Sequence, residues 1–207
     1  WADEVITGFG RTGNDFGCTT MGIDSPDMMT FAKQLSSAYM PISASAIRRD
    51  VYDAMIDQTA SAGAFGHGYT YSGHPVACAV ALKTQQIFQR DQIFDKAAVT
   101  GEYLQKRLTE FADHPLVGEV RGCGLLGAIE LVANKQTGEP FVGGAVGGYA
   151  QKMAQDNGLL IRAVAGSSLG FCPPLIISND QIDEMMAIVA VALDATLQHC
   201  HRENLLV

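Results

Sequence analysis

Short apolar runs alternate with longer segments of helical period along this chain of 207 residues. The runs are too short to be core helices, so we expect strands at 1–7, 28–32 and 42–47, the first two of them buried. Further along, the same reasoning predicts a Gly- and Ser-rich loop at 59–68, helices at 74–88, 94–111, 146–153 and 182–197, and strands at 117–120, 125–132, 159–161 and 169–171. This alternation favours an α/β or mixed architecture.

Interruptions of the pattern indicate where elements and domains end. Gly158 is placed to close the helix before it, because glycine readily adopts the left-handed conformation of a helix C-terminus. Asn179 or Asp180 is placed to cap the last helix. The helical pattern breaks near Asp91, so we expect two domains, at 1–92 and 93–207.

Charge and cysteine usage exclude several classes of protein. The 14 Lys and Arg against 22 Asp and Glu give a net charge of −8, and no basic run exceeds the Arg48-Arg49 pair, which disfavours a nucleic-acid partner. No apolar run approaches the roughly 20 residues that a membrane span needs. The 5 cysteines are scattered without a C-x-x-C pair, so we expect no metal site and reduced thiols in a cytoplasmic protein.

Two short motifs match catalytic or binding patterns without the structural context that these patterns need. Residues 8–13 match G-x-G-x-x-G, but turn-like sequence follows where a dinucleotide-binding helix should begin. Residues 166–170 match G-x-S-x-G, but Pro173-Pro174 follows where a hydrolase needs a helix. We interpret both as ordinary turns.

Asp3 and Lys33 follow apolar strands, at the sheet edge where open α/β folds bind ligands. A lysine after so apolar a run either extends its amine to solvent or is buried for a reason, since an unpaired buried ammonium costs several kcal/mol. Covalent use is one such reason, because desolvation favours the neutral amine that forms a Schiff base with an aldehyde. Taken alone, Lys33 fits the solvent-exposed alternative better.

Longer stretches around these residues resemble the class III aminotransferases, which are pyridoxal-phosphate enzymes of fold type I. The resemblance begins with Asp-Glu-Val-x-x-Gly-Phe-Gly-Arg-Thr-Gly at 3–13, Pro-Asp-Met-Met-Thr-Phe-Ala-Lys-Gln-Leu-Ser-Ser-Ala-Tyr at 26–39 and His-Gly-Tyr-Thr-Tyr-Ser-Gly-His-Pro at 67–75. It continues through 120–126, 158–163 and 172–177, and so covers essentially the whole chain. It implies part of the mainly parallel-sheet large domain at 1–92 and the α+β small carboxyl-terminal domain at 93–207.

The resemblance implies a role for each matching residue. Asp3 would accept a hydrogen bond from the pyridine nitrogen, and Val5 would pack on the ring. Lys33 would hold pyridoxal 5′-phosphate as a Schiff base and later move a proton as general base and acid. Thr70, with the backbone beside Tyr69, would bind the cofactor phosphate of a neighbouring subunit, which implies a homodimer or larger homo-oligomer. Without the resemblance, Asp3 fits a strand-end cap, Val5 fits a core residue and Thr70 fits a turn hydroxyl.

Arg162 would bind the carboxylate of a keto acid in the ω-transaminase branch of this family, and swing away when an amine without a carboxylate enters. The glycine-bearing segment 166–170 is suited to such movement. Taken alone, Arg162 fits a surface charge better, and we interpret Arg121 as structural.

Features that the family carries upstream of the lysine motifs have no counterpart in this sequence. They are an amino-terminal segment, a Gly/Ser turn around the phosphate and an aromatic residue stacked on the pyridine ring. Because the sequence starts at Trp1, within an apparent strand, we expect it to be the carboxyl-terminal portion of a longer enzyme. Ala38 also replaces the glycine of many relatives.

The resemblance therefore implies transfer of an amino group from a primary amine or ω-amino acid to a keto acid such as pyruvate. The donor is left open among polyamines such as putrescine, β-alanine, taurine and aryl alkyl amines. Two alternatives also stay open: an aminomutase or racemase on the same scaffold, and a non-catalytic fragment that needs its amino-terminal half.

Overall fold

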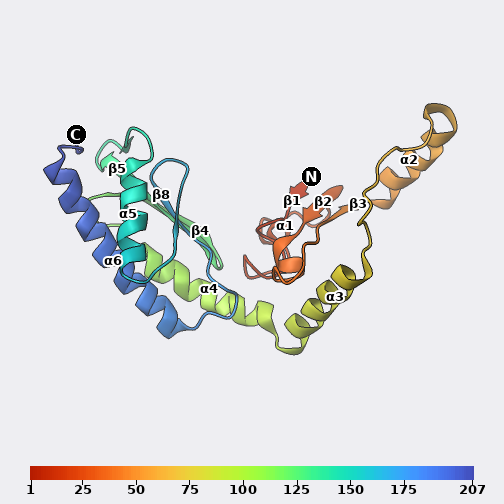
Figure 1. Ribbon diagram of the computed structural model, residues 1–207, viewed down its shortest axis with the longest axis horizontal. Helices are drawn as coiled ribbons and strands as arrows, with labels where there is room; N and C mark the ends of the chain where they lie inside the picture. The colour runs from red at the N-terminus through yellow and green to blue at the C-terminus, as the bar shows by residue number, and fades with distance from the viewer. The chain divides into compact units, whose positions relative to one another are not determined.

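The computed structural model describes residues 1–207, which form two compact units, Trp1–Asp95 and Lys96–Val207. The division lies three residues beyond the expected boundary at 92/93. Each unit is described by itself, and Figure 1 shows the elements of both. No helix in either unit has both the length and the apolar character needed to cross a membrane.

The first unit contains a three-stranded sheet in the order β1-β2-β3. Strand β1 (Ala2–Asp3) runs parallel to β2 (Met28–Phe31), which runs antiparallel to β3 (Ala44–Ile47). The expected strand at 1–7 is wrong in its length, because the chain leaves the sheet after the Glu4 amide, which donates to the Thr30 carbonyl at 2.8 Å. Turns follow immediately.

The expectation that the first two strands are buried is also wrong for the residues described. Side chains of β1 and β2 are exposed or half-buried, and those of β3 are exposed. The physical reason is that little of the unit covers the sheet: α3 (Pro75–Arg90) buries only three of its residues, and α2 (Arg49–Ala62) buries none.

The helices of the first unit also include α1 (Gly17–Thr20) and a 3₁₀ turn, η1 (Lys33–Leu35). The helix expected at 74–88 is confirmed as α3, with Pro75 in its first turn. Helix α2 was not expected, although its apolar residues recur at helical spacing as clearly as those of α3. Its last residues occupy the start of the loop expected at 59–68.

The turn after η1 holds two non-glycine residues in the left-handed region, Ser37 with φ +47° and Ala38 with φ +61°. Neighbouring groups fix this turn. The Ser36 hydroxyl donates to the Met40 carbonyl at 2.7 Å, and the Gln85 amide of α3 donates to the Leu35 carbonyl at 3.0 Å. An L-residue pays about 1–2 kcal/mol for this conformation, and glycine does not. Ala38 is therefore strained.

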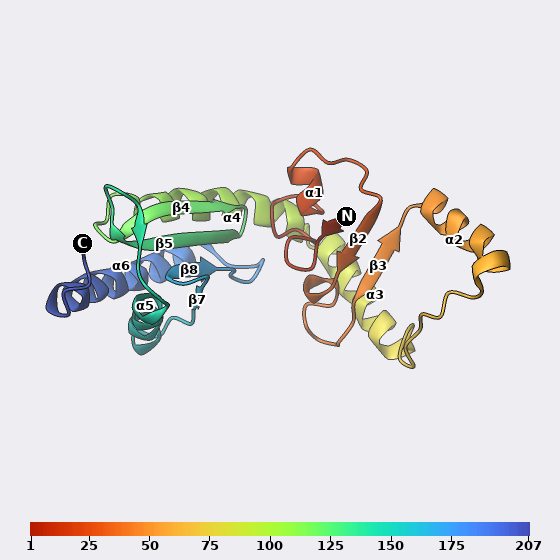
Figure 2. The same cartoon turned by 90° about the horizontal axis from the view of Figure 1, so that it is seen from above.

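The second unit is an antiparallel sheet packed against helices, in the α+β form expected at 93–207. Its strands are β4 (Val117–Cys123), β5 (Leu126–Asn134), β8 (Ser168–Phe171) and β7 (Arg162–Val164), in that order, with β6 (Glu139–Pro140) beside β5. Its helices are α4 (Ile93–Thr109), whose first three residues belong to the first unit, α5 (Ala145–Asp156) and α6 (Asn179–Arg202). Figure 2 shows α4 and α6 alongside this sheet.

The core of the second unit lies between these helices and the sheet. Its fully buried side chains come from α4, from the strands and from α6: Leu104, Leu108, Ile129, Leu131, Leu169, Phe171, Ile182, Met186 and Leu193. Met185 is buried as well, so the methionines of the last helix are core residues, as expected. This core is larger than that of the first unit, where few side chains are buried.

The strand expected at 159–161 is wrong, and the strand lies at 162–164 instead. The reason is that Gly158, with φ +93°, ends α5 as expected, and the Leu159 amide then donates to the Ala154 carbonyl at 2.9 Å. The residues after the helix are therefore used to close it before the chain can pair with β8.

Helix α6 begins with a capping box one residue before the expected cap at Asn179 or Asp180. The Gln181 amide donates to the Ser178 hydroxyl at 3.2 Å, and the Ser178 amide donates to the Gln181 side-chain carbonyl at 3.0 Å. Two amide groups that a helix start leaves unpaired are thereby satisfied.

Replacing Ser178 by alanine removes this cap, so we expect Ser178→Ala to lower the free energy of unfolding by about 1 kcal/mol. Urea unfolding followed by circular dichroism measures the change. Ser178→Thr, which keeps the hydroxyl, should retain most of the stability. Equal stability of the alanine variant and the parent protein would contradict the role of the capping box.

Replacing Ala38 by glycine relieves the left-handed backbone, so we expect Ala38→Gly to raise the free energy of unfolding by about 1 kcal/mol. The matched control is Ala79→Gly, which makes the same substitution at an exposed position inside α3 and should lower it by about 1 kcal/mol. The same urea titration measures both changes in the free energy of unfolding, which should have opposite signs. A loss of stability in Ala38→Gly would show that this turn is not strained.

Candidate active site

Asp3 and Lys33 lie at one edge of the sheet in the first unit. Strands β1 and β2 are parallel, and Asp3 pairs with Thr30. Lys33 follows three residues later, as the first residue of η1, just beyond the end of β2. Both side chains therefore belong to the carboxyl-terminal edge of a parallel strand pair, where α/β folds place their ligands.

The side chain of Lys33 is exposed in this structure. Its Nζ has no hydrogen-bond or ion-pair partner in the structure, and the side chain is not buried in the unit. Its backbone is unusual, because φ is +40°, in the left-handed region. Non-glycine residues in this region are uncommon and cluster at functional sites.

The carboxylate of Asp3 is only partly used by the protein. Its Oδ1 accepts the Val5 amide at 3.1 Å, and its Oδ2 has no partner. Asp3 is exposed and Val5 is half-buried. The structure thus presents one unpaired carboxylate oxygen and one unpaired amine at the same sheet edge.

Glu4 was not predicted from the sequence, yet it is the buried carboxylate of this region, with only 2% of its surface exposed. It accepts hydrogen bonds from the Thr7 hydroxyl, from the Gly17 amide at 2.8 Å and from the Cys18 amide at 2.6 Å. Burial alone would raise the pKa of Glu4, but these hydrogen bonds outweigh burial and hold it below its ordinary value. The one sequence signal was an acidic residue directly before a glycine-rich turn.

The segment 5–16 forms a loop of turns whose aromatic residues pack on β2. The Phe9 ring lies 5.5 Å from Phe16 and 5.7 Å from Phe31, both in edge-to-face geometry. No helix continues from the third glycine of the G-x-G-x-x-G match, so its interpretation as a turn is confirmed. The loop therefore contacts the strand that leads to Lys33.

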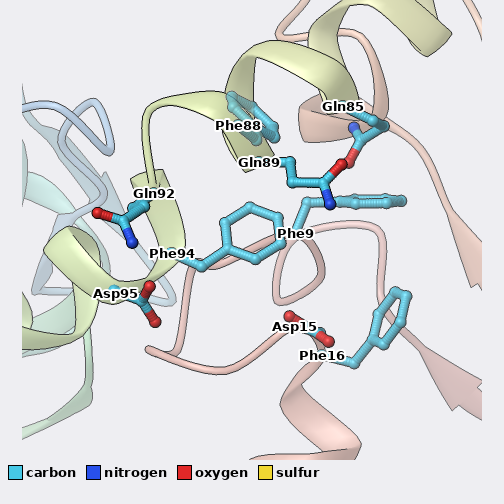
Figure 3. Close-up of a pocket in the computed structure, with 9 residues that line it drawn as sticks. All are labelled: Phe9, Asp15, Phe16, Gln85, Phe88, Gln89, Gln92, Phe94 and Asp95. Atoms are coloured by element: carbon cyan, nitrogen blue, oxygen red, sulfur yellow. The ribbon is translucent and has the colours of Figure 1, made fainter.

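A cavity of about 590 Å³ lies in the first unit. Figure 3 shows the residues that line it. Phenyl rings and two carboxylates line it, and Gln85 of α3 borders it, but none of the predicted site residues does. A second cavity of about 900 Å³ lies between Met40–Ala44 and the segment around Tyr69. Neither cavity is lined by Asp3 or Lys33.

Tyr69 and Thr70 lie in the exposed segment that joins α2 to α3. The side chain of Tyr69 is 73% exposed and that of Tyr71 is 80% exposed, and Thr70 begins a turn. Tyr69 borders the second cavity, whereas Thr70 does not. The structure does not bring either residue to Asp3 or Lys33 within the chain.

Arg162 is the first residue of β7 in the second unit, where it pairs with Gly170 of β8. Its side chain is exposed and has no partner. Arg121, by contrast, pairs with Glu119 at 2.8 Å and with Glu130, in agreement with a structural role.

The G-x-S-x-G match covers the end of the turn between β7 and β8 and the first three residues of β8. Ser168 is buried in β8, and Gly166 has φ +84°. A hydrolase nucleophile must stand exposed between a strand and a helix, so this match does not form a nucleophile elbow. Its interpretation as a turn is correct only for its first two residues, because the rest lie in β8.

Comparisons with known proteins identify the family. The model described as "Aminotransferase class-III" matches residues 1–193. An uncharacterized aminotransferase of Sinorhizobium fredii is 45% identical over 208 residues, which cover 98% of this chain and 44% of that protein. A putrescine–pyruvate aminotransferase of Pseudomonas aeruginosa is 47% identical over 196 residues, which cover 94% of this chain and 42% of that protein.

Solved structures agree with the sequence comparisons. An ω-transaminase from Pseudomonas jessenii, in complex with PMP, superposes with a TM-score of 0.90 and 47% identity over 95% of this chain and 43% of that chain. The chain thus spans less than half the length of these relatives. Class III aminotransferases depend on pyridoxal 5′-phosphate and have fold type I. The family match, the identities and the shared fold together show that this chain belongs to the class III aminotransferases.

Proposed function

We propose that the chain supplies the lysine and the ring-binding carboxylate of an enzyme that transfers an amino group from a primary amine to a keto acid such as pyruvate. The observation that carries the proposal is the pair of unpaired groups, Asp3 and Lys33, at one edge of two parallel strands in a class III chain. The putrescine–pyruvate aminotransferase among the relatives supports pyruvate as acceptor and a primary amine as donor.

The residues present fit pyridoxal 5′-phosphate. The unpaired Oδ2 of Asp3 suits the protonated pyridine nitrogen, and half-buried Val5 offers an apolar contact for the ring face. Lys33 offers a free amine for covalent attachment of the cofactor aldehyde. When bound, the cofactor supplies the electron sink that makes a carbon–hydrogen bond beside the amine labile.

Lys33 would also move the proton of the reaction. Once the donor amine has displaced it, its Nζ would take the proton from the substrate carbon as general base and return a proton as general acid. Its lack of a partner supports this role, because no protein group holds the amine in place. The fixed turn behind it, bound by Gln85 and Ser36, would keep the start of the side chain still while its end moves.

Arg162 would bind the carboxylate of the keto acid. Its guanidinium is exposed and unpaired at the start of β7, and can make two parallel hydrogen bonds to a carboxylate. The turn that follows β7 holds Ala165 with φ +45° and Gly166 with φ +84°. The regular strand therefore ends two residues after Arg162.

A second subunit would complete the site. Thr70 and the backbone beside Tyr69 would bind the cofactor phosphate of the neighbouring subunit, and the exposure of the aromatic side chains in this segment supports a covered position in the assembly. We therefore propose a cytoplasmic homodimer or larger homo-oligomer. Within it, Trp1–Asp95 would belong to the cofactor-binding large domain and Lys96–Val207 would form the small domain.

The aminomutase or racemase alternative has no support from the relatives named above, which are aminotransferases and a transaminase. The non-catalytic alternative is an outcome of the first test below. The amine donor stays open, since no cavity in the chain selects one of the candidates.

Reduction with borohydride should fix the cofactor to Lys33, because it makes the linkage between lysine and cofactor permanent. We expect mass spectrometry of the full-length protein to place a pyridoxyl adduct on the peptide that contains Lys33. Lys33→Ala should lose the adduct, whereas Lys83→Ala, at an exposed lysine of α3, should keep it. An adduct on the full-length protein but none on the 207-residue chain by itself would support the non-catalytic alternative.

Replacing Arg162 by leucine should raise the KM for pyruvate by about tenfold or more, because it removes a charged two-point contact. The KM for a donor amine without a carboxylate should change little. Arg162→Lys should recover only part of the affinity, since lysine cannot make the paired contact. Arg202→Leu, at the exposed end of α6, serves as control, and equal effects of Arg162→Leu on both substrates would contradict the clamp.

A further inference from the structure

The buried carboxylate of Glu4 has no part in the proposed reaction, and its setting shows what it does. Its two oxygens accept from different donors: Oε2 accepts the Gly17 amide at 2.8 Å and the Thr7 hydroxyl, while Oε1 accepts the Cys18 amide at 2.6 Å. Three donors directed at one carboxylate make charge-assisted hydrogen bonds, which are about twice as strong as neutral ones. Glu4 thereby joins the end of β1 to the start of α1.

These bonds close the segment 5–16 into a loop. The Gly8 amide donates to the Glu4 carbonyl at 3.0 Å, so the backbone of Glu4 is held as well as its side chain. The closure is tight: a Cβ at Gly17 would lie 2.7 Å from the Thr7 Cβ, and a Cβ at Gly8 would lie 2.9 Å from the Glu4 carbonyl oxygen. Larger residues at Gly8 or Gly17 would force this loop open.

Glu4 lies between the two residues proposed to bind the cofactor ring. Asp3 is exposed, Glu4 is buried and Val5 is half-buried, so the side chain of Glu4 is turned inward at the point where the chain leaves β1. The Asp3 carboxylate also accepts the Val5 amide. Fixing the side chain of Glu4 therefore fixes the backbone on both sides of it.

We propose that Glu4 is a positioning residue: its buried carboxylate anchors the loop 5–16 and so holds Asp3 and Val5 in the orientation that binds the cofactor ring. This inference rests on the proposed function, because it assigns Glu4 a task only if Asp3 contacts the cofactor. The rings of Phe9 and Phe31 extend the same anchorage to β2, two residues before Lys33.

A double-mutant cycle in the full-length protein tests this inference. The variants are Glu4→Gln, Asp3→Asn and the double variant, and the readout is the dissociation constant of pyridoxal 5′-phosphate for the apoenzyme. Glutamine keeps the shape of glutamate but carries one oxygen, so it cannot accept at both former oxygen positions. We expect Glu4→Gln to weaken cofactor binding about tenfold alone and less than about twofold in the Asp3→Asn background.

The same loss in both backgrounds would overturn the inference, because Glu4 would then act on stability and not through Asp3. Glu102→Gln, which removes an exposed carboxylate from α4, is the control for charge and should leave cofactor binding unchanged. If Glu4→Gln does not fold, Thr7→Val enters the same cycle, since it removes one donor to Glu4 and keeps the side-chain shape. We expect it to weaken binding about threefold, again only when Asp3 is present.

The pH dependence of the visible absorbance of the bound cofactor gives a second readout, which a change in the stability of the fold alone does not alter. If Glu4 positions Asp3, Glu4→Gln should shift the pH dependence of this absorbance in the same direction as Asp3→Asn does. An absorbance titration identical to that of the parent protein would overturn the inference. Failure of the proposed function gives a different result, because the parent protein itself would then show neither cofactor absorbance nor an adduct on Lys33.

Discussion

The parallel pairing of β1 with β2 is the constraint on which the candidate site depends. Parallel strands end at the same edge of a sheet, so the pairing of Asp3 with Thr30 brings Asp3 and the residues after β2 to one place. A parallel pair needs a long connection between its strands. Here that connection contains the loop 5–16 and α1, and the carboxylate of Glu4 fixes it where it leaves β1.

Charge pairing separates the arginines that hold the fold together from those that are free to bind. Several arginines pair with a carboxylate, among them Arg48, Arg49, Arg90, Arg107 and Arg121. Arg162 has no partner, and neither does Arg202 in the last turn of α6, where the helix C-terminus itself favours a positive charge. Arg162 lacks even that stabilisation, which fits a guanidinium kept available for an anionic ligand.

The sequence was a good guide wherever a structural requirement left a periodic pattern. Helices α3 and α6 bury one face, so their apolar spacing predicts them, and the strand ends predict the placement of Asp3 and Lys33. Helix α2 is an exception, because it has a comparable apolar spacing that the prediction missed, and it buries no residue. Glu4 could not be found either, because its partners are backbone amides at Gly17 and Cys18, and a backbone amide is present whatever the residue.

The burial of Cys18 has a consequence for how this region can be followed in solution. Desolvation raises the pKa of its thiol, and the neighbouring Glu4 carboxylate raises it further, so the reactive thiolate is scarce in the folded protein. Cys78 and Cys172 are exposed by contrast. A thiol reagent would therefore modify those two cysteines rapidly, and Cys18 only when the surrounding structure opens locally. The slow labelling rate of Cys18 would then report how often the loop anchored by Glu4 opens.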